Sequence, residues 1–338
     1  MHIFKNAKLG KEKREVSFRK NIHLEELLNS LNTTLGCAEE KMIAEDSILG
    51  PKYPLLFIMG PLRSGTTLFT QWLAHTGVVA YPTNLLSRFY GAPVIGAQIQ
   101  KLLTDPLYNF RDELCEFDHS VSFESENGKT KGVLEPNEFW YFWRRFLPFH
   151  EIDWMNDDEL FRVVDREKLV KELTSLTRVF QKPFALKSMI LNYNISFLDR
   201  IFDNALFVQI KRNPVTNVAS ILDARRRQLG DERAWYSFKI PEYPELKDLD
   251  PVTQAAGQLY YINKAVTGGM STVPDSRKLI VQYEQFCLDP RAVFKELLAI
   301  LGLGGKNINY PGPEKFKVSR KGQVINQKVI EKALLKFL

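Results

Sequence analysis

The chain has 338 residues, of which 44% are hydrophobic and 25% charged, as in an ordinary globular protein. Its net charge of +6 suits anionic ligands, but the basic residues are too dispersed to indicate a nucleic-acid-binding protein. No apolar tract is long enough to span a bilayer, and three widely spaced cysteines argue against a disulfide framework or a metal site. We therefore expect a reduced, cytoplasmic protein.

Residues 1–50 are expected to form a basic arm followed by a helix. The first 20 residues carry seven Lys and Arg side chains. This pattern predicts either peripheral contact with a membrane or polyanion, or a solvated arm. The arm lacks the apolar segment of a secretory signal. Apolar residues at near-helical spacing then predict a helix over residues 22–46.

A strand, a glycine-bracketed loop and a helix follow in close succession. The continuous apolar run Leu55–Met59 predicts a strand that is buried on both faces of a parallel sheet. Gly60 and Gly65 bracket a tight turn, and a helix is expected from Thr66 onward. Such a unit presents backbone N–H groups and the positive end of a helix dipole, which together bind phosphate.

This loop differs from a nucleoside-triphosphatase loop in the position of its cation. Thr66 stands where that motif requires lysine, and the basic residue is Arg63, inside the loop. A triphosphatase also needs an acidic residue at the end of another strand to hold magnesium, and the later predicted strands do not supply one. We therefore expect a metal-free anion site formed by Arg63, Ser64, Gly65, Thr66 and Thr67.

Residues 80–180 are expected to form a substrate-facing insertion. Within it, residues 83–104 have a mixed pattern, and residues 120–132 are polar enough for an exposed loop. Residues 139–149 contain seven aromatic side chains, which predict core packing or, alternatively, an acceptor cleft for a sugar or a lipid tail. Pro136 and Glu138 fit the first and third positions of a helix.

The second half of the chain alternates between predicted strands and helices. Strands are expected at 183–189, 205–210 and 278–283, and helices at 157–180, 194–202, 214–227, 252–270 and 290–302. Asn213 and Asp289 are the expected caps of two of these helices. The pattern predicts an α/β fold: a three-layer sandwich with a central, mainly parallel sheet and a phosphate-binding loop, similar to P-loop nucleoside triphosphatases.

A second anion site is predicted from Arg212 and Ser220. Arg212 follows a predicted strand, and Ser220 lies about two turns into the next helix. Because parallel strands end at one crevice, this pair and the first loop can face the same ligand. Arginine presents a planar fork to phosphate. The two sites together predict a nucleotide with phosphates at both ends.

Four segments, in this order, resemble sulfotransferases that use 3′-phosphoadenosine 5′-phosphosulfate (PAPS). They are the loop at 61–68, the stretch 207–220, the Tyr-Glu and Asp-Pro signature at 281–302, and the tripeptide Arg320-Lys321-Gly322. The resemblance implies that the first loop binds the 5′-phosphosulfate, that Arg212 and Ser220 bind the 3′-phosphate, and that residues 320–322 close on the nucleotide. It leaves the region 80–180 largely unmatched.

The resemblance also implies a catalytic machinery. Arg63 would stabilise the leaving phosphate, and Lys187 stands where related enzymes carry a catalytic lysine. Many relatives have a general-base glutamate shortly after the first helix, but residues 81–84 contain no carboxylate. Our candidates for the base are therefore Glu138 and then Glu135. The reserve candidates are His75, Asp118 and His119.

We therefore expect a sulfotransferase domain at 51–322 and a C-terminal helix at 323–338. The enzyme would transfer a sulfuryl group from PAPS to a hydroxyl acceptor, a carbohydrate or a glycolipid, and release adenosine 3′,5′-bisphosphate. Two alternatives remain open. One is a kinase or other phosphotransferase of the P-loop type, and the other is a nucleotide-binding protein without catalytic activity.

Overall fold

The computed structural model describes residues 21–44, 53–109, 111, 113–114, 121–125, 128–319 and 327–338. Several predictions lie outside these ranges: the basic arm at 1–20, the reserve bases Asp118 and His119, and the nucleotide loop Arg320-Lys321-Gly322.

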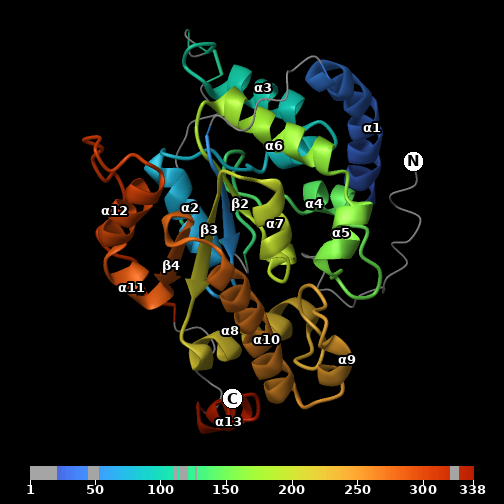
Figure 1. The fold of residues 1–338 in the computed structure, drawn as a ribbon, viewed down its shortest axis with the longest axis vertical. Helices are drawn as coiled ribbons and strands as arrows, with labels where there is room; N and C mark the ends of the chain where they lie inside the picture. The colour runs from blue at the N-terminus through green and yellow to red at the C-terminus, as the bar shows by residue number, and fades with distance from the viewer. Residues whose placement is uncertain are drawn as a thin grey trace.

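A four-stranded sheet with the strand order β2-β1-β3-β4 forms the centre of the described fold. Every neighbouring pair is parallel, and Leu55 is in register with both Phe184 and Ala205. The predicted parallel sheet is thus confirmed (Figure 1). The strands are β1 (Leu55–Met59), β2 (Phe184–Lys187), β3 (Ala205–Lys211) and β4 (Lys278–Gln282).

Helices cover both faces of the sheet, which gives the predicted three layers (Figure 1). One face is covered by α2 (Thr66–Thr76), α11 (Tyr283–Leu288) and α12 (Pro290–Ile300). The other is covered by α4 (Trp140–Phe146), α6 (Arg166–Phe180), α7 (Ile195–Ile201), α8 (Pro214–Leu229) and α10 (Pro251–Thr272). The remaining helices are α1 (Ile22–Ala44), α3 (Pro93–Thr104), α5 (Asp157–Val163), α9 (Tyr243–Leu246) and α13 (Gln327–Leu334), with short 3-10 turns at η2 (Leu86–Phe89), η4 (Met189–Leu191) and η5 (Asp275–Arg277).

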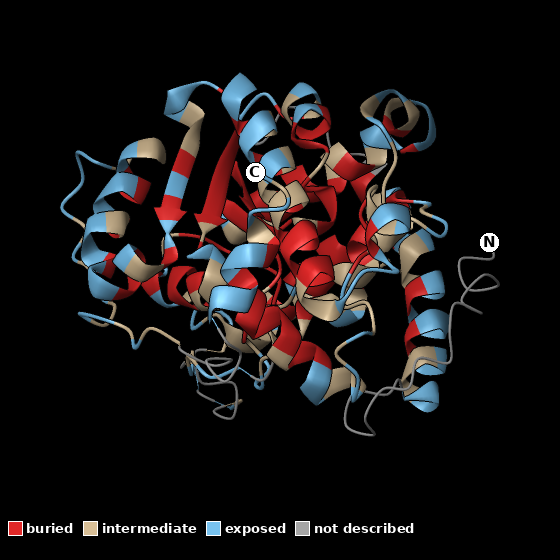
Figure 2. Ribbon diagram, turned by 90° about the horizontal axis from the view of Figure 1, so that it is seen from below, coloured by how far each residue is buried: buried red, intermediate tan, exposed pale blue. Residues whose placement is uncertain are grey.

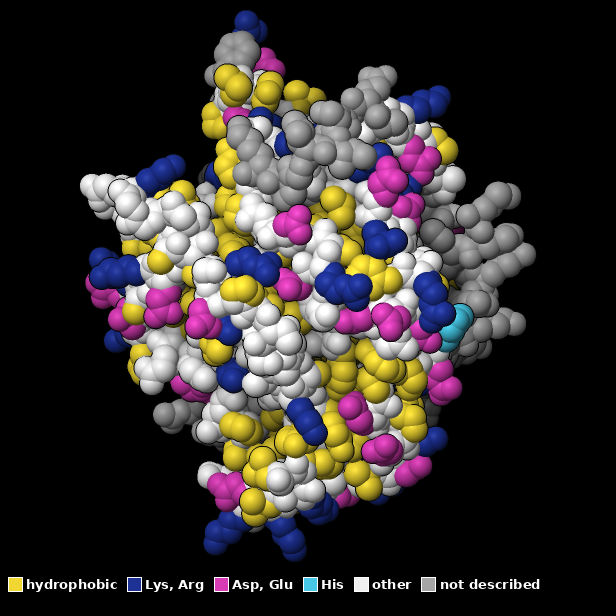
Figure 3. Space-filling model, viewed as in Figure 1, with side chains coloured by type: hydrophobic (Ala, Val, Ile, Leu, Met, Phe, Trp, Pro, Cys, Tyr) yellow, Lys and Arg dark blue, Asp and Glu magenta, His cyan; other side chains and the backbone are white. Residues whose placement is uncertain are grey.

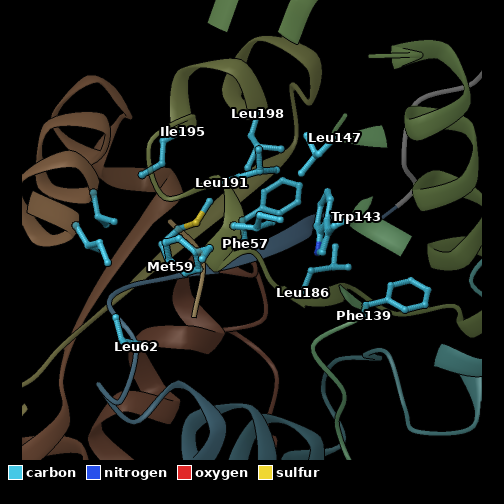
Figure 4. Packing of buried hydrophobic residues seen from close by; sticks show 14 of the residues in the cluster. Phe57, Met59, Leu62, Phe139, Trp143, Leu147, Leu186, Leu191, Ile195 and Leu198 are labelled. Atoms are coloured by element: carbon cyan, nitrogen blue, oxygen red, sulfur yellow. The ribbon is translucent and has the colours of Figure 1, made fainter. Parts of the chain in front are cut away.

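Successive residues of β1 point into two separate hydrophobic cores. Leu56 and Ile58 pack in the cluster beneath α2 and α12, whereas Phe57 and Met59 pack in the larger cluster beneath α4, α7 and α10. All five residues of β1 are fully buried, which explains its uninterrupted apolar run. Figure 2 shows that most of the sheet and the inner sides of its helices are buried, whereas β4 has exposed residues. Figure 4 shows Phe57 packed near Trp143 and Leu186.

The predicted helix caps are present. The Asn213 side chain accepts a hydrogen bond from the Thr216 amide at the start of α8. The Asp289 carboxylate accepts one from the Ala292 amide at the start of α12. Each cap satisfies a backbone donor that the helix itself leaves unpaired. These helices therefore begin where the sequence predicted.

Two predictions in the region 80–180 need correction. The helix predicted at 157–180 is divided into α5 and α6, because Asp165 accepts a hydrogen bond from Lys168 N and starts a second helix. The mixed segment 83–104 contains the regular helix α3. The amides of Val94 and Ile95 in its first turn donate to the buried Glu39 carboxylate on α1, a partner too distant for local sequence patterns to indicate.

The predicted helix start at Pro136 is wrong. Helix α4 begins at Trp140, after Phe139 adopts a left-handed backbone with φ of 55° and the Asn137 side chain accepts from its amide. Glu138 consequently lies before the helix and not at its third position. Its carboxylate therefore does not cap the helix, contrary to what the sequence suggested.

None of the helices that the structure describes combines the length and hydrophobicity needed to cross a membrane. On the face shown in Figure 3, Lys and Arg side chains are interspersed with Asp and Glu.

Candidate functional site

The carboxyl ends of all four strands contribute to one cavity of about 1210 Å³. The loop after β1 contributes Arg63 and residues 65–68, and β2 contributes its last residue, Lys187. Arg212 follows β3, and Tyr283 follows β4. Pockets for one small ligand usually measure roughly 300–1,000 Å³, so this cavity has room for a donor and an acceptor together.

Two buried asparagines fix the glycine loop. The Asn192 side chain donates to Gly60 O at 2.8 Å and accepts from Gly60 N at 3.0 Å. The Asn217 side chain donates to Leu62 O at 2.9 Å. Gly60 itself has φ of 142°, and a Cβ there would lie 2.7 Å from Ile210 O. The loop is therefore held in shape by its neighbours as well as by its own glycines.

Gly65 allows the loop to approach Tyr283 closely. Its φ is 102°, and a Cβ at this position would lie 2.2 Å from the Tyr283 ring. Gly65 also precedes α2, where no described side chain caps the first amides. These N–H groups and the helix dipole make this end of α2 suitable for an anion, and phosphate binding here stays a prediction.

Arg212 is a buried cation with neutral partners. Its guanidinium donates to Arg63 O at 2.8 Å and to Ser319 O at 2.6 Å, and lies over the Tyr283 ring at 4.8 Å. Its Nε is buried with no partner among the described residues. Burial lowers the pKa of this guanidinium, because removal from water penalises the charge. An anion that supplies negative charge here would offset this penalty.

The two predicted anion-binding groups meet in the structure. Arg63 Nε donates to the Ser220 hydroxyl at 3.3 Å across 157 residues of sequence, and the Arg63 carbonyl accepts from Arg212. Arg63 has a left-handed backbone, with φ of 62°, which directs its carbonyl and side chain to these partners. Arg63, Arg212 and Ser220 thus form one cluster. Its guanidinium and hydroxyl donors suit an anion such as a phosphate group.

Lys187 joins the glycine loop to the candidate base. Its buried ammonium group donates to Thr67 Oγ1 at 3.1 Å and forms an ion pair with Glu138 Oε1 at 2.6 Å. The Lys187 side chain is 4% exposed, whereas that of Glu138 is 48% exposed. The carboxylate thus reaches the cavity while the lysine fixes one of its oxygens.

The other candidate bases are directed elsewhere. Glu135 is buried, and its carboxylate accepts from Gln71 Nε2 at 3.0 Å and from Ser122 N at 2.5 Å. It is not among the described residues that line the cavity. His75 lies nine residues beyond Thr66 on α2, about 14 Å along the helix axis.

The remaining loop residues take different positions. Thr66 lines the cavity, and its hydroxyl contacts Met189 Sδ at 3.6 Å. The Ser64 hydroxyl is buried with no partner among the described residues, and Ser64 does not line the cavity. It belongs to the supporting side of the loop in this conformation.

Sequence reasoning missed the supporting residues of the site. Tyr283 was noted only as part of a strand–helix signature, although it contacts both Gly65 and Arg212. Asn192 and Asn217 carry no motif that a single sequence displays. The glycine at position 65 is the available signal, because a residue without Cβ in a tight turn allows a close neighbour but does not identify it.

The comparisons with known proteins agree with this architecture. The model of the Sulfotransferase family matches residues 54–305. The fold resembles the crystal structure of sulfotransferase STF9 from Mycobacterium avium, with a TM-score of 0.50 and 15% sequence identity over 96% of this chain and 87% of that one. It also resembles sulfotransferase STF1 from Mycobacterium tuberculosis H37Rv, with a TM-score of 0.53 and 12% identity over 89% and 81% of the two chains.

A search of curated protein sequences gave no significant match. At such low identities the structural similarity establishes the fold alone. The family match carries more, because it covers well over half of the chain and includes all four strands and the loops at their carboxyl ends. From this match, and in keeping with the fold, the chain belongs to the sulfotransferase family.

Proposed function

We propose that this sulfotransferase moves a sulfuryl group from PAPS to a hydroxyl of a carbohydrate or glycolipid. The observation that carries the choice of donor is the cluster of Arg212, Arg63 and Ser220 beside the glycine loop. Arg212 is buried, has neutral hydrogen-bond acceptors, and its Nε has no partner in the part of the chain that the structure describes. These features suit a nucleotide with a second phosphate.

The proposed donor contacts follow the cavity wall. Thr66, Thr67 and the first amides of α2 would bind the 5′ end, with Ser64 and Gly65 shaping the loop. Arg212 and Ser220 would bind the 3′-phosphate. Residues 320–322 stay a prediction from the sequence, since they lie outside the described ranges. PAPS supplies the sulfuryl group, and the chain supplies the charges and donors around it.

The proposed chemistry needs a base beside the acceptor hydroxyl and cations beside the leaving phosphate. Glu138 would accept the proton of the acceptor hydroxyl, because its exposed carboxylate lies at the cavity. Lys187 and Arg63 would stabilise negative charge that develops on the leaving phosphate. Lys187 also holds the Glu138 carboxylate in place. The same lysine would therefore act on the donor, through the leaving phosphate, and on the acceptor, through the base.

Calorimetric titration and a transfer assay test the proposal. Adenosine 3′,5′-bisphosphate should bind more tightly than ATP with magnesium, and radiolabelled PAPS should yield a sulfated hydroxyl compound. Preference for ATP with magnesium would favour the phosphotransferase alternative. Tight bisphosphate binding without transfer to any acceptor in a broad panel would favour the non-catalytic alternative.

We also propose a cytoplasmic location, supported by the two described cysteines, Cys37 and Cys287, which are both free thiols.

A further inference from the structure

The aromatic block at 139–149 is divided between the core and the cavity. Phe139, Phe142 and Phe146 are buried in the larger core cluster. Trp140, which is partly buried, lines the cavity, whereas Trp143, three residues further along α4, belongs to the same core cluster and borders the cavity with only 1% of its surface exposed. Positions separated by three lie on one face of a helix, so both indoles border the same space. Glu138, the candidate base, immediately precedes this face.

A chain of ion pairs and hydrogen bonds holds Trp140. The Arg144 guanidinium lies over the Trp140 ring at 4.9 Å and forms an ion pair with Asp153 at 2.6 Å. The Asp153 amide in turn donates to Lys239 O, and the Asp153 carboxylate accepts from the Lys239 amide, each at 2.9 Å. Lys239 follows residues 236–238, which also line the cavity. Trp140 and this segment are therefore positioned together.

Trp143 is fixed from the side of the core. Its ring lies 6.5 Å from that of Phe57, and Figure 4 shows it among Phe57, Leu147 and Leu186. Its Nε1 is buried with no partner among the described residues. Gln228, which also lines the cavity, donates to the Tyr236 hydroxyl at 2.9 Å. This end of the cavity thus combines rigid aromatic surface with a few neutral polar groups.

The charged groups lining the cavity lie near the proposed donor site. Arg63, Arg212 and Lys187 belong to it directly. Lys317 is two residues from Ser319, which accepts from Arg212. Lys129 follows Gly128, where a Cβ would lie 3.5 Å from Thr67 Oγ1. Glu138, paired with Lys187, is the acidic group of the lining. Among the described residues, the rest of the lining is uncharged and includes Trp140, Trp143, Met189, Ile190, Tyr236 and Phe238.

From this division we infer that the acceptor is an uncharged glycoside with an apolar aglycone, and that its sugar ring lies against Trp140. The inference rests on the proposed function and specifies its acceptor. The C–H face of a sugar packs on an indole, and the neutral polar groups can pair with its hydroxyls. Met189, Ile190 and Phe238 provide an apolar surface for the aglycone. Arg144, the cation beside Trp140, is already paired with Asp153, so it leaves little positive charge there for a polyanionic polysaccharide.

Binding to the protein saturated with adenosine 3′,5′-bisphosphate tests the inference. The probes are n-octyl β-D-glucoside below its micelle concentration and an unsulfated polysaccharide of alternating uronic acid and amino sugar. Titration should detect the glucoside, and saturation-transfer NMR on the unmodified protein should mark its ring protons and first methylenes. Preferential binding of the polyanion, or no binding of the glucoside, would overturn the inference.

A matched pair of variants on α4 locates the contact. Trp140→Leu should weaken glucoside binding about tenfold, because it removes the aromatic platform. Tyr141→Leu is the control, since the Tyr141 hydroxyl donates to Glu25 and its ring lies beside Tyr90. Equal glucoside affinity in the two variants would contradict the assigned surface. The bisphosphate titration separates the two proposals. If the bisphosphate itself fails to bind, the proposed function is wrong. If the bisphosphate binds and the glucoside does not, only the inferred acceptor is wrong.

Discussion

The ammonium group of Lys187 and the carboxylate of Glu138 form an ion pair of 2.6 Å at the carboxyl end of β2. The lysine ends β2, and the glutamate precedes α4, 49 residues earlier in the chain. Thr67, at the start of α2, accepts a second hydrogen bond from the same ammonium group at 3.1 Å. The lysine therefore connects the two halves of the cavity: the loop proposed to bind the donor and the carboxylate proposed to activate the acceptor.

Removing the Lys187 charge should impair transfer far more than donor binding. In Lys187→Met we expect at least about a 100-fold loss of kcat, the usual effect of deleting one preorganised group that stabilises developing charge. Adenosine 3′,5′-bisphosphate affinity should change much less, because this product lacks the sulfuryl group. Lys182→Met is the control: Lys182 is exposed and donates to Gly77 O. Similar kcat losses in both variants would remove Lys187 from the reaction.

Substituting Glu138 and Glu135, the exposed and the buried glutamate before α4, should separate catalysis from stability. Glu138→Gln should lower kcat by about 10²–10⁴, the usual contribution of a general base, and leave bisphosphate affinity intact. Glu135→Gln should instead lower the melting temperature, because its carboxylate accepts from Gln71 and Ser122. Steady-state kinetics and thermal unfolding on both variants provide the measurement. A larger kcat loss in Glu135→Gln would reverse the assignment.

Arg212 should discriminate between nucleotides with and without a 3′-phosphate. Arg212→Ala should weaken adenosine 3′,5′-bisphosphate binding by about 1.5–3 kcal/mol, the usual value of hydrogen bonds to charged groups. Its affinity for adenosine 5′-monophosphate should change little. Arg226→Ala, an exposed position on α8 paired with Glu232, is the control. Equal losses for the two nucleotides would indicate that Arg212 supports the loop and does not bind the 3′-phosphate.

Stability should depend on pH through Glu39. Burial raises the pKa of this carboxyl from its ordinary 4.5 to about 7. Between these values the folded chain binds the proton more tightly than the unfolded chain. The stabilisation from this proton is therefore complete below about pH 4.5 and is lost as the pH rises through about 7. Urea unfolding across this range should show a smaller pH slope for Glu39→Gln, whereas Glu26→Gln, exposed on the same helix, should retain the wild-type slope.

The fold was predictable because its strands and caps are local features. Strand β1 is a continuous apolar run, since both of its faces are buried, and Asn213 marks the start of α8 by its own hydrogen bond. Helix α3 is not predicted from the sequence, because the acceptor for its first amides is Glu39, which lies far away in the sequence on α1. Local patterns reveal partners within a turn of helix and not those brought together by folding.

The same distinction applies to the site. The glycine spacing and hydroxyl residues predicted where an anion-binding loop lies, and the alternation of strands and helices predicted that Arg212 would face it. The sequence could not show that Arg63 would contact Ser220, or that Glu138 would pair with Lys187 outside a helix. These contacts depend on loop conformations, such as the left-handed backbone of Phe139, that many residue types can adopt at a cost.

Gly65 provides a test of the loop that does not depend on charge. Gly65→Ala places a methyl group 2.2 Å from the Tyr283 ring and imposes a left-handed conformation that alanine disfavours. We expect loss of measurable bisphosphate binding together with a lower melting temperature. Gly268→Ala is the control, because a Cβ in that part of α10 meets nothing within 4 Å and should stabilise the helix by about 0.5–1 kcal/mol. Near-normal bisphosphate binding by Gly65→Ala would mean that the loop can move away from Tyr283, and that the close contact is not needed to present the amides of α2 to the nucleotide.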